Sequence, residues 1–103
     1  MSRITDTFKL RAHGELAGSA TAVQMPSIAG KAVQFSTDPD NAGSVFVGLA
    51  TSMTVGAGTT TTTAGLELKP GVLSPLFLLD GSLDELWRRC DNAGDDMTYM
   101  IYS

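Results

Sequence analysis

Side chains able to carry out catalysis are scarce in this sequence. His13 is its single histidine and Cys90 its single cysteine. An imidazole can serve as a general base or a metal ligand and a thiolate as a nucleophile, but each needs a partner group close by. The neighbours of His13 favour a surface turn. The acidic residues that follow Cys90 disfavour its thiolate, so we expect this cysteine in the core or at an interface. We expect no enzyme activity.

Oxygen-bearing side chains are concentrated near the C-terminal end of the chain, at Asp91, Asn92, Asp95 and Asp96. Calcium prefers carboxylate and amide oxygens as ligands. The spacing is not that of an EF-hand loop, and Asp and Asn are also common in tight turns. We expect a turn here, with no bound metal or cofactor, and a bound cation is the alternative.

The clearest structural pattern is a tight turn between two β-type segments, residues 34–37 and 44–48. Asp38, Pro39, Asn41 and Gly43 are all strong turn formers. Pro39 presets φ, Asn41 tolerates a left-handed backbone, and Gly43 accepts a positive φ without steric cost. The pattern predicts a β-hairpin whose register is set by this turn.

Two other turns are indicated by the sequence. Residues 40–43, Asp-Asn-Ala-Gly, recur as residues 91–94. The recurrence could mark duplicated halves, or it could be the same turn chemistry used twice. Because the flanking segments do not match, we favour the second interpretation. Pro70 and Gly71 predict a further turn.

Strand patterns dominate the remaining chain, with turn residues about every ten positions. For residues 82–90, the capping box of Ser82 and Glu85 predicts a short helical turn, whereas alternation predicts a strand. The other predicted strands are residues 8–11, 18–25, 31–37, 44–49, 53–55, 64–69, 76–79 and 97–102. Residues 76–79 form a continuous apolar run, which is typical of a fully buried strand.

These patterns predict a single all-β domain spanning residues 1–103. The expected fold is a small antiparallel β-sandwich or jelly-roll-like barrel of about eight strands, with at most one short helical turn. Residues 1–7 are a candidate N-terminal arm, and the threonine run at residues 59–63 is a candidate loop.

Composition limits the classes of partner. Charged residues make up 17% of the chain and hydrophobic residues 43%, whereas about 25% charged is usual for a soluble domain. The low charge indicates either neutral β-loops or a subunit held against others. A net charge of -4 leaves no basic stripe for nucleic acid. No apolar run approaches the ~18 residues of a membrane span. The start of the chain lacks the apolar core of a signal peptide, so we expect synthesis in a cytoplasm.

Six residues are candidates for a contact with another protein. They are Val72, Leu73, Leu76, Trp87, Arg88 and Arg89. The first three are apolar residues around Pro75 and predict exposed apolar surface. The last three join an indole to two guanidinium groups, a composition enriched among interface anchors. The alternative is a tryptophan in the core beside two solvated arginines.

The order of elements from residue 31 to residue 103 resembles small virion proteins of tailed bacteriophages. In those proteins a strand–turn–strand segment like residues 33–48 is often followed by a glycine- and threonine-rich stretch, here residues 56–65. An apolar-Pro-Gly turn comes next, here residues 66–71. A Leu-Asp-x-Leu-Trp-like strand, here residues 83–87, and an alternating aromatic strand, here residues 97–102, complete the pattern. Polar residues are common directly after the Pro-Gly turn, where this chain has Val-Leu, and this departure favours an interface there.

The resemblance implies a compact β-sandwich on a phage particle, most often a capsid decoration (cement) protein. Its partner would then be the major capsid protein, its location the outer surface of the virion capsid, and its assembly a small homo-oligomer, with a trimer favoured over a dimer. One alternative is a carbohydrate-binding or fibre-base module that uses Trp87 and Tyr102. Another is a cupin-like small-molecule barrel, against which the lack of a histidine cluster argues.

Overall fold

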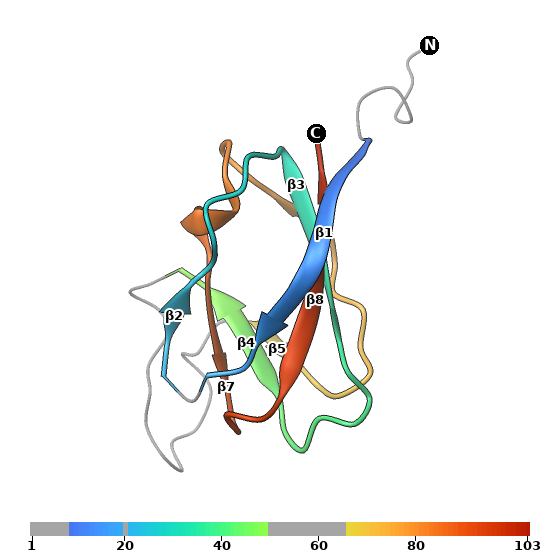
Figure 1. Ribbon diagram of the computed structural model, residues 1–103, viewed down its shortest axis with the longest axis vertical. Helices are drawn as coiled ribbons and strands as arrows, with labels where there is room; N and C mark the ends of the chain where they lie inside the picture. The colour runs from blue at the N-terminus through green and yellow to red at the C-terminus, as the bar shows by residue number, and fades with distance from the viewer. Residues whose placement is uncertain (1–8, 20, 50–65) are drawn as a thin grey trace.

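The computed structural model describes residues 9–19, 21–49 and 66–103. They form two four-stranded antiparallel sheets packed face to face (Figure 1). Sheet A has the order β1 (Leu10–Ala17), β8 (Asp96–Tyr102), β3 (Ala32–Thr37), β6 (Phe77–Leu78). Sheet B has the order β2 (Val23–Gln24), β7 (Trp87–Cys90), β4 (Val45–Gly48), β5 (Leu66–Leu68). The predicted all-β sandwich is confirmed.

The core lies between the two sheets and is built from alternate strand positions. In β3, Val33 and Phe35 point inward, whereas Gln34 between them is half-buried. In β8, Met97 and Ile101 are buried in the same way. Sheet B contributes the buried residues Val45, Val47, Leu68 and Cys90. This period of two places one face of each strand against the other sheet and leaves the second face outward.

The predicted hairpin between β3 and β4 is wrong. β3 pairs with β8 and β6 in sheet A, whereas β4 pairs with β7 and β5 in sheet B. Residues 38–44 therefore form a β-arch, a connection that carries the chain from one sheet to the other. No register exists between strands that do not pair. The turn residues were recognised correctly, but turn chemistry alone does not say whether the strand that follows pairs with the strand before it or crosses to the facing sheet.

A second β-arch, residues 91–95, joins β7 of sheet B to β8 of sheet A and packs against the first. The buried carboxylate of Asp95 accepts the backbone N–H groups of Ala42 and Gly43 at 2.8 and 3.0 Å. The amide side chain of Asn41 donates to the carbonyl oxygen of Asp96 and accepts its N–H, at 2.8 and 2.9 Å. The recurring Asp-Asn-Ala-Gly segments thus lie side by side at one end of the sandwich (Figure 1).

Gly43 packs closely and does not have the positive φ that we predicted. Among the described residues, only Gly71 and Gly81 have positive φ. A Cβ at position 43 would lie 2.8 Å from the Cβ of Asp91 and 2.8 Å from the Nδ2 of Asn92. Glycine is needed here because the two arches approach each other, and not because of its backbone freedom.

The other turn residues act locally. In the first arch the Asp38 carboxylate accepts the N–H of Asp40 at 2.9 Å, and the Asp38 carbonyl accepts the N–H of Asn41. Pro70 and Gly71 lie in the expected turn, where Gly71 has φ 74°. That pairing of proline and left-handed glycine is typical of a type II turn.

Residues 82–90 combine the two alternatives that the sequence left open. A 3-10 turn, Leu83–Glu85, comes first and β7 follows it. The Glu85 carboxylate accepts the backbone N–H groups of Ser82 and Asp80 at 3.0 and 2.8 Å.

Three other predictions need correction, and three more lie outside the described residues. His13 is not in a turn, because β1 continues through it with Met100 of β8 opposite. Residues 76–79 are not a fully buried strand, because β6 is two residues long and lies at the edge of sheet A. Within residues 18–25, only Val23–Gln24 forms a strand. The predicted arm, the strand at residues 53–55 and the threonine loop fall outside the described residues.

Candidate functional site

The six predicted contact residues fall into two separate groups. Val72, Leu73 and Leu76 lie between β5 and β6, along the side of β3 that faces away from β8. Trp87, Arg88 and Arg89 form most of β7 in the other sheet. The two groups therefore do not make one surface, and each is described by itself.

The first group borders an edge of sheet A that exposes leucine side chains. Leu73 lies opposite Ser36, and Leu78 lies opposite Ala32, so residues 73–78 run along β3. Leu73, Leu76 and Leu78 are 59%, 43% and 75% exposed. We call these three residues the leucine edge. The sequence reasoning missed Leu78, because the continuous apolar run around it was interpreted as buried.

Hydrogen bonds hold the backbone of the leucine edge against β3. The buried Ser74 hydroxyl accepts the N–H of Phe35 at 2.9 Å, and the Ser74 N–H donates to the Phe35 carbonyl at 2.8 Å. Gln34 Nε2 donates to the Ser74 carbonyl at 2.9 Å. Val72 is half-buried against the core, and its N–H donates to Thr37 Oγ1 at 2.9 Å. The leucines are therefore presented from a fixed backbone.

In the second group, Arg88 ties the two sheets together. Its Nε donates to the carbonyl of Ala17 at the end of β1 (3.2 Å), and its Nη1 donates to the carbonyl of Gln24 in β2 (3.5 Å). Burial lowers the pKa of the Arg88 guanidinium. Because these bonds join β7 to a strand of the other sheet, this side chain has a structural role.

Arg89 is buried against an aromatic ring. It is 7% exposed, and its guanidinium carbon lies 4.7 Å from the centroid of the Phe46 ring. Its Nε has no hydrogen-bond partner within the part of the chain that the structure describes. Trp87 is half-buried against the same ring. Arg89 is buried, whereas Arg88 is half-buried with its guanidinium bonded to backbone carbonyls. The alternative of two solvated arginines therefore fails at Arg89, and we place no partner contact on either residue.

The outward face of sheet A carries a row of apolar residues. Leu10, Tyr102, Ala32 and Leu78 lie opposite one another on β1, β8, β3 and β6. Beside this row is a shallow groove of about 530 Å³, lined in part by Leu10, His13 and Met100. The exposed ends of the row, Leu10 and Leu78, are 56% and 75% exposed. This face therefore offers apolar area, and His13 and Glu15 of β1 also line its groove.

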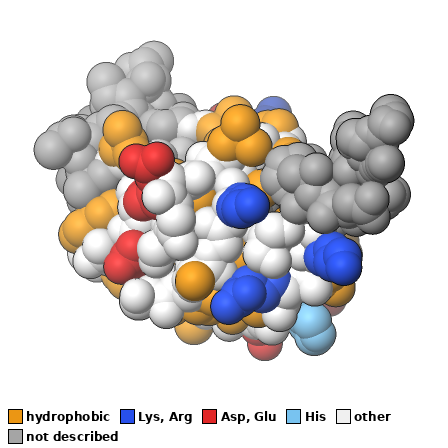
Figure 2. All heavy atoms as spheres, turned by 90° about the horizontal axis from the view of Figure 1, so that it is seen from above, with side chains coloured by type: hydrophobic (Ala, Val, Ile, Leu, Met, Phe, Trp, Pro, Cys, Tyr) orange, Lys and Arg blue, Asp and Glu red, His pale blue; other side chains and the backbone are white. Residues whose placement is uncertain are grey.

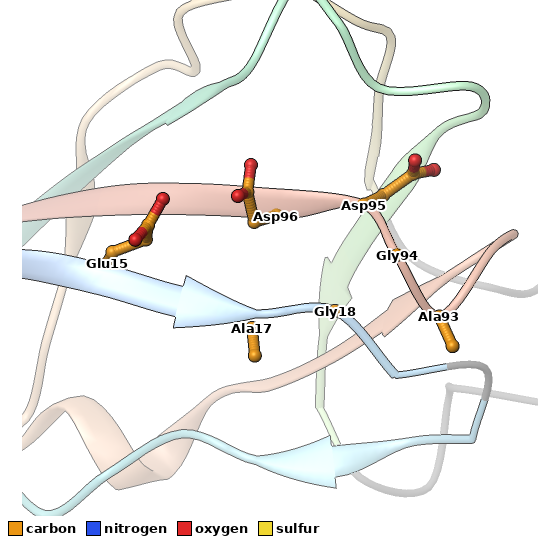
Figure 3. A pocket seen from close by; sticks show the side chains of 7 residues that line it. All are labelled: Glu15, Ala17, Gly18, Ala93, Gly94, Asp95 and Asp96. Carbon is orange, nitrogen blue, oxygen red and sulfur yellow. The ribbon is translucent and has the colours of Figure 1, made fainter.

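A smaller acidic hollow of about 280 Å³ lies between the end of β1 and the second arch (Figure 3). The Glu15 and Asp96 carboxylates project to the same side, whereas Asp95 turns toward the first arch (Figure 3). A hydrogen bond with Asp96, together with its charge, raises the pKa of Glu15. Two carboxyl groups that share a proton could serve in acid–base chemistry. Here Glu15 is fully exposed, and no described His, Lys or nucleophile completes a reaction site in the hollow.

The oxygen cluster proposed for a cation is divided between structural roles. Asp95 holds the first arch, and the Asp91 carboxylate accepts the N–H of Ser44 at 3.1 Å. Among the described residues, no group of three or more His, Cys, Asp or Glu side chains is placed to hold a metal ion. Cys90 is buried, and burial, with a smaller contribution from the charge of Asp95, raises the pKa of its thiol. An inert core cysteine fits this environment.

Charges of opposite sign lie apart on the end of the sandwich seen in Figure 2. Acidic groups are mostly on one side and Lys and Arg on the other, with exposed hydrophobic groups between them (Figure 2). Within the described residues, no helix has the length and apolar character to cross a membrane.

Comparison of the chain with family models, with curated proteins and with solved structures gives no match in any of the three. The surfaces described above and the sequence pattern of residues 31–103 are therefore the features that bear on function.

Proposed function

We propose that this chain is a structural protein that binds the outer surface of a phage capsid as a small homo-oligomer and reinforces contacts between capsid subunits. The observation that carries the proposal is the leucine edge, in which three exposed leucines stand on a backbone fixed by Ser74 and Gln34. The resemblance of residues 31–103 to phage virion proteins supports the choice of the major capsid protein as the partner.

Exposed leucines on a rigid edge suit a protein contact because little conformational entropy is lost when they are buried. Side chains presented by an ordered backbone have already lost the backbone freedom that a loop would lose on binding. A repeated copy on a symmetric shell would add avidity without a strong single contact. A protein that binds only the intact shell stabilises the shell by mass action.

The test uses capsids that lack this protein. Purified protein is added, bound protein is measured by cosedimentation, and genome release is followed against temperature. We expect the protein to bind and to raise the release temperature. Absence of a shift at saturating occupancy would contradict the cement function.

A matched pair of variants locates the contact. Leu73→Ser with Leu78→Ser should weaken cosedimentation, whereas Leu66→Ser, at an exposed leucine of sheet B, should not. Equal binding by the two variants would remove the leucine edge from the proposal.

The alternative of a carbohydrate platform has weaker support. Trp87 belongs to β7 of sheet B and Tyr102 to β8 of sheet A, so these rings do not share one face. Stacking on a sugar needs aromatic rings that present one continuous apolar surface.

A further inference from the structure

The edge of sheet A opposite the leucine edge is formed by β1. This strand has eight residues, and within the described ranges its one partner strand is β8. In an antiparallel strand the N–H and C=O of one residue point to the same side, and successive residues alternate. An edge strand therefore presents every second residue's backbone groups to whatever lies beside it.

Hydrogen bonds on both sides of β8 show which residues of β1 face outward. Tyr102 of β8 faces β3, because its carbonyl accepts the N–H of Lys31 at 2.8 Å. Its neighbour Ser103 faces β1 and exchanges bonds with Lys9 at 3.1 and 2.9 Å. By alternation Met97, Tyr99 and Ile101 also face β1, and their register partners are Leu16, Gly14 and Ala12. The backbone groups of His13 and Glu15 therefore point away from β8. The Arg11 carbonyl also points away, because it belongs to the same peptide group as the Ala12 N–H, whereas the bulge before Ala12 leaves Arg11 without a register partner.

The side chains of the same three residues are exposed on the outward face of the sheet. Read along β1, they carry a positive charge, an imidazole and a negative charge. A second copy that runs antiparallel presents the three groups in the opposite order. The positive charge of each copy then lies opposite the negative charge of the other, so the order is self-complementary.

We propose that two copies of this chain pair through β1, antiparallel and about a twofold axis at His13, so that Arg11 of each copy lies opposite Glu15 of the other. The N–H and C=O of His13 then pair with those of His13 in the second copy, and the N–H of Glu15 donates to the Arg11 carbonyl of the second copy. The two copies of sheet A become one continuous sheet across the axis.

Charge selects this register over its neighbours. A shift of two residues places His13 opposite Glu15 in one direction and opposite Arg11 in the other, so Arg11 and Glu15 no longer face each other. The second shift brings Glu15 toward Lys9, but the Lys9 backbone is already bonded to Ser103. Opposite-charge pairs stabilise directly opposed positions, and like charges destabilise them. A shift by one residue would pair outward backbone groups with groups already bonded to β8.

Both ends of the paired stretch are closed by features of the fold. At one end the bulge at Arg11, between Leu10 and Ala12, breaks the regular alternation of the strand. At the other end the Ala17 carbonyl is occupied by Arg88. The pairing is therefore limited to residues 11–15, which keeps the sheet from extending further.

The surroundings of Glu15 also favour a cation from outside. A hydrogen bond with Asp96 and the charge of Asp96, followed by smaller contributions from desolvation and from the charge of Asp38, raise the pKa of Glu15. Arg11 of a second copy would bring a guanidinium to this position.

The twofold pair differs from the trimer expected from the sequence, because an isologous contact closes at two copies. It does not depend on capsid binding, since it concerns the free protein in solution. Failure of the capsid experiments and failure of this pairing are therefore separate results.

Sedimentation equilibrium of the full chain and of charge-reversal variants tests the pairing. Arg11→Glu and Glu15→Arg should each raise the dimer dissociation constant about tenfold or more, since two charge pairs become repulsive. The double variant should restore dimerisation, because the pairs are then reversed. Lys69→Glu, the same charge change at an exposed lysine outside β1, should leave the constant unchanged. A wild-type monomer at millimolar concentration, a trimer, or no restoration in the double variant would overturn the proposal.

Amide hydrogen exchange by NMR gives a second, independent test. In concentrated wild-type protein the amides of His13 and Glu15 should exchange slowly. In dilute protein and in Arg11→Glu they should exchange fast. The amides of Ala12, Gly14 and Leu16, bonded to β8, should stay protected throughout. Fast exchange of residues 13 and 15 at every concentration would contradict the pairing.

Discussion

The arch end of the sandwich and the β1 edge both contain carboxylates and backbone N–H groups, but they use them in opposite ways. At the arch end, Asp95 is buried and its two oxygens are bonded to Ala42 and Gly43. At the β1 edge, Glu15 is exposed and its neighbour Asp96 is also acidic. Polar groups at the arch end are bonded within the chain, whereas the outward backbone groups of the β1 edge have no partner strand among the described residues.

This difference separates stability from association. Removing an acceptor at the arch end leaves buried donors without a partner, which is costly in the folded state. Removing or reversing a charge at the edge alters an exposed group, which changes folding stability little. Substitutions in the two regions should therefore have distinguishable effects, and four predictions follow from the largest to the smallest.

Asp95→Ala should have the largest effect on folding. It removes the acceptor of two backbone N–H groups at a position that is 4% exposed. We expect a loss of about 2–4 kcal/mol in the free energy of unfolding, because charged acceptors are worth more than neutral ones and the donors stay buried. Urea unfolding in dilute protein measures it, with Asp80→Ala as an exposed control. A loss no greater than that of the control would show that Asp95 does not stabilise the contact between the two arches.

Gly43→Val should cost about 1–2 kcal/mol, because the added atoms meet the Asp91 and Asn92 side chains at the junction of the arches. Gly94 is the corresponding glycine of the second Asp-Asn-Ala-Gly segment, and a Cβ there meets no atom within 4 Å. Gly94→Ala should therefore be neutral, or stabilising by about 0.4–1 kcal/mol through the unfolded chain. If both substitutions lowered the free energy of unfolding equally, close packing of the arches would not explain the effect of Gly43→Val.

Leu78→Ser should leave the free energy of unfolding within about 0.5 kcal/mol of the wild type, because the side chain is 75% exposed. Its binding to capsids should nevertheless fall. The pair of measurements is urea unfolding and cosedimentation. A large loss of stability with unaltered capsid binding would show that Leu78 supports the fold and does not contact the capsid.

Glu15→Gln should have a small, pH-dependent effect. The pKa of Glu15 is raised in the folded chain, so the fold favours its protonated form. The resulting stabilisation is present below the unfolded-state pKa and is lost as the pH rises through the folded-state pKa. In dilute protein at neutral pH the variant should melt slightly above the wild type, and the difference should vanish in acid. A variant that melts lower at neutral pH would contradict the unfavourable Glu15–Asp96 contact.

The sandwich could be predicted because period-two patterns and turn residues are local signals. Val33, Phe35, Met97 and Ile101 were all in alternating segments, and each lies in the core. The crossing of the chain between sheets at residues 38–44 could not be predicted, because a tight turn looks the same whether it closes a hairpin or an arch. Pairing with β8 depends on contacts far along the chain.

The candidate surfaces were predictable in part. Leu73 and Leu76 stood out as apolar residues after a Pro-Gly turn, and both are exposed. Arg89 lies on the Phe46 ring because β7 pairs with β4, and no spacing in the sequence reveals that contact. The charged residues of β1 can be read from the sequence. Their possible role in pairing two copies could not be predicted, because the sequence does not show that β1 lies at the edge of a sheet.

The separation of stability from association is tested most directly by the melting temperature as a function of protein concentration. A dimer that forms only from folded chains makes the melting temperature rise with concentration. We predict this rise for the wild type and the same rise from a lower starting point for Asp95→Ala. For Arg11→Glu we predict a rise that begins at about tenfold or more higher concentration, with a melting temperature that meets the wild type at high dilution. A flat wild-type line, or a rise in Arg11→Glu equal to that of the wild type, would contradict the account.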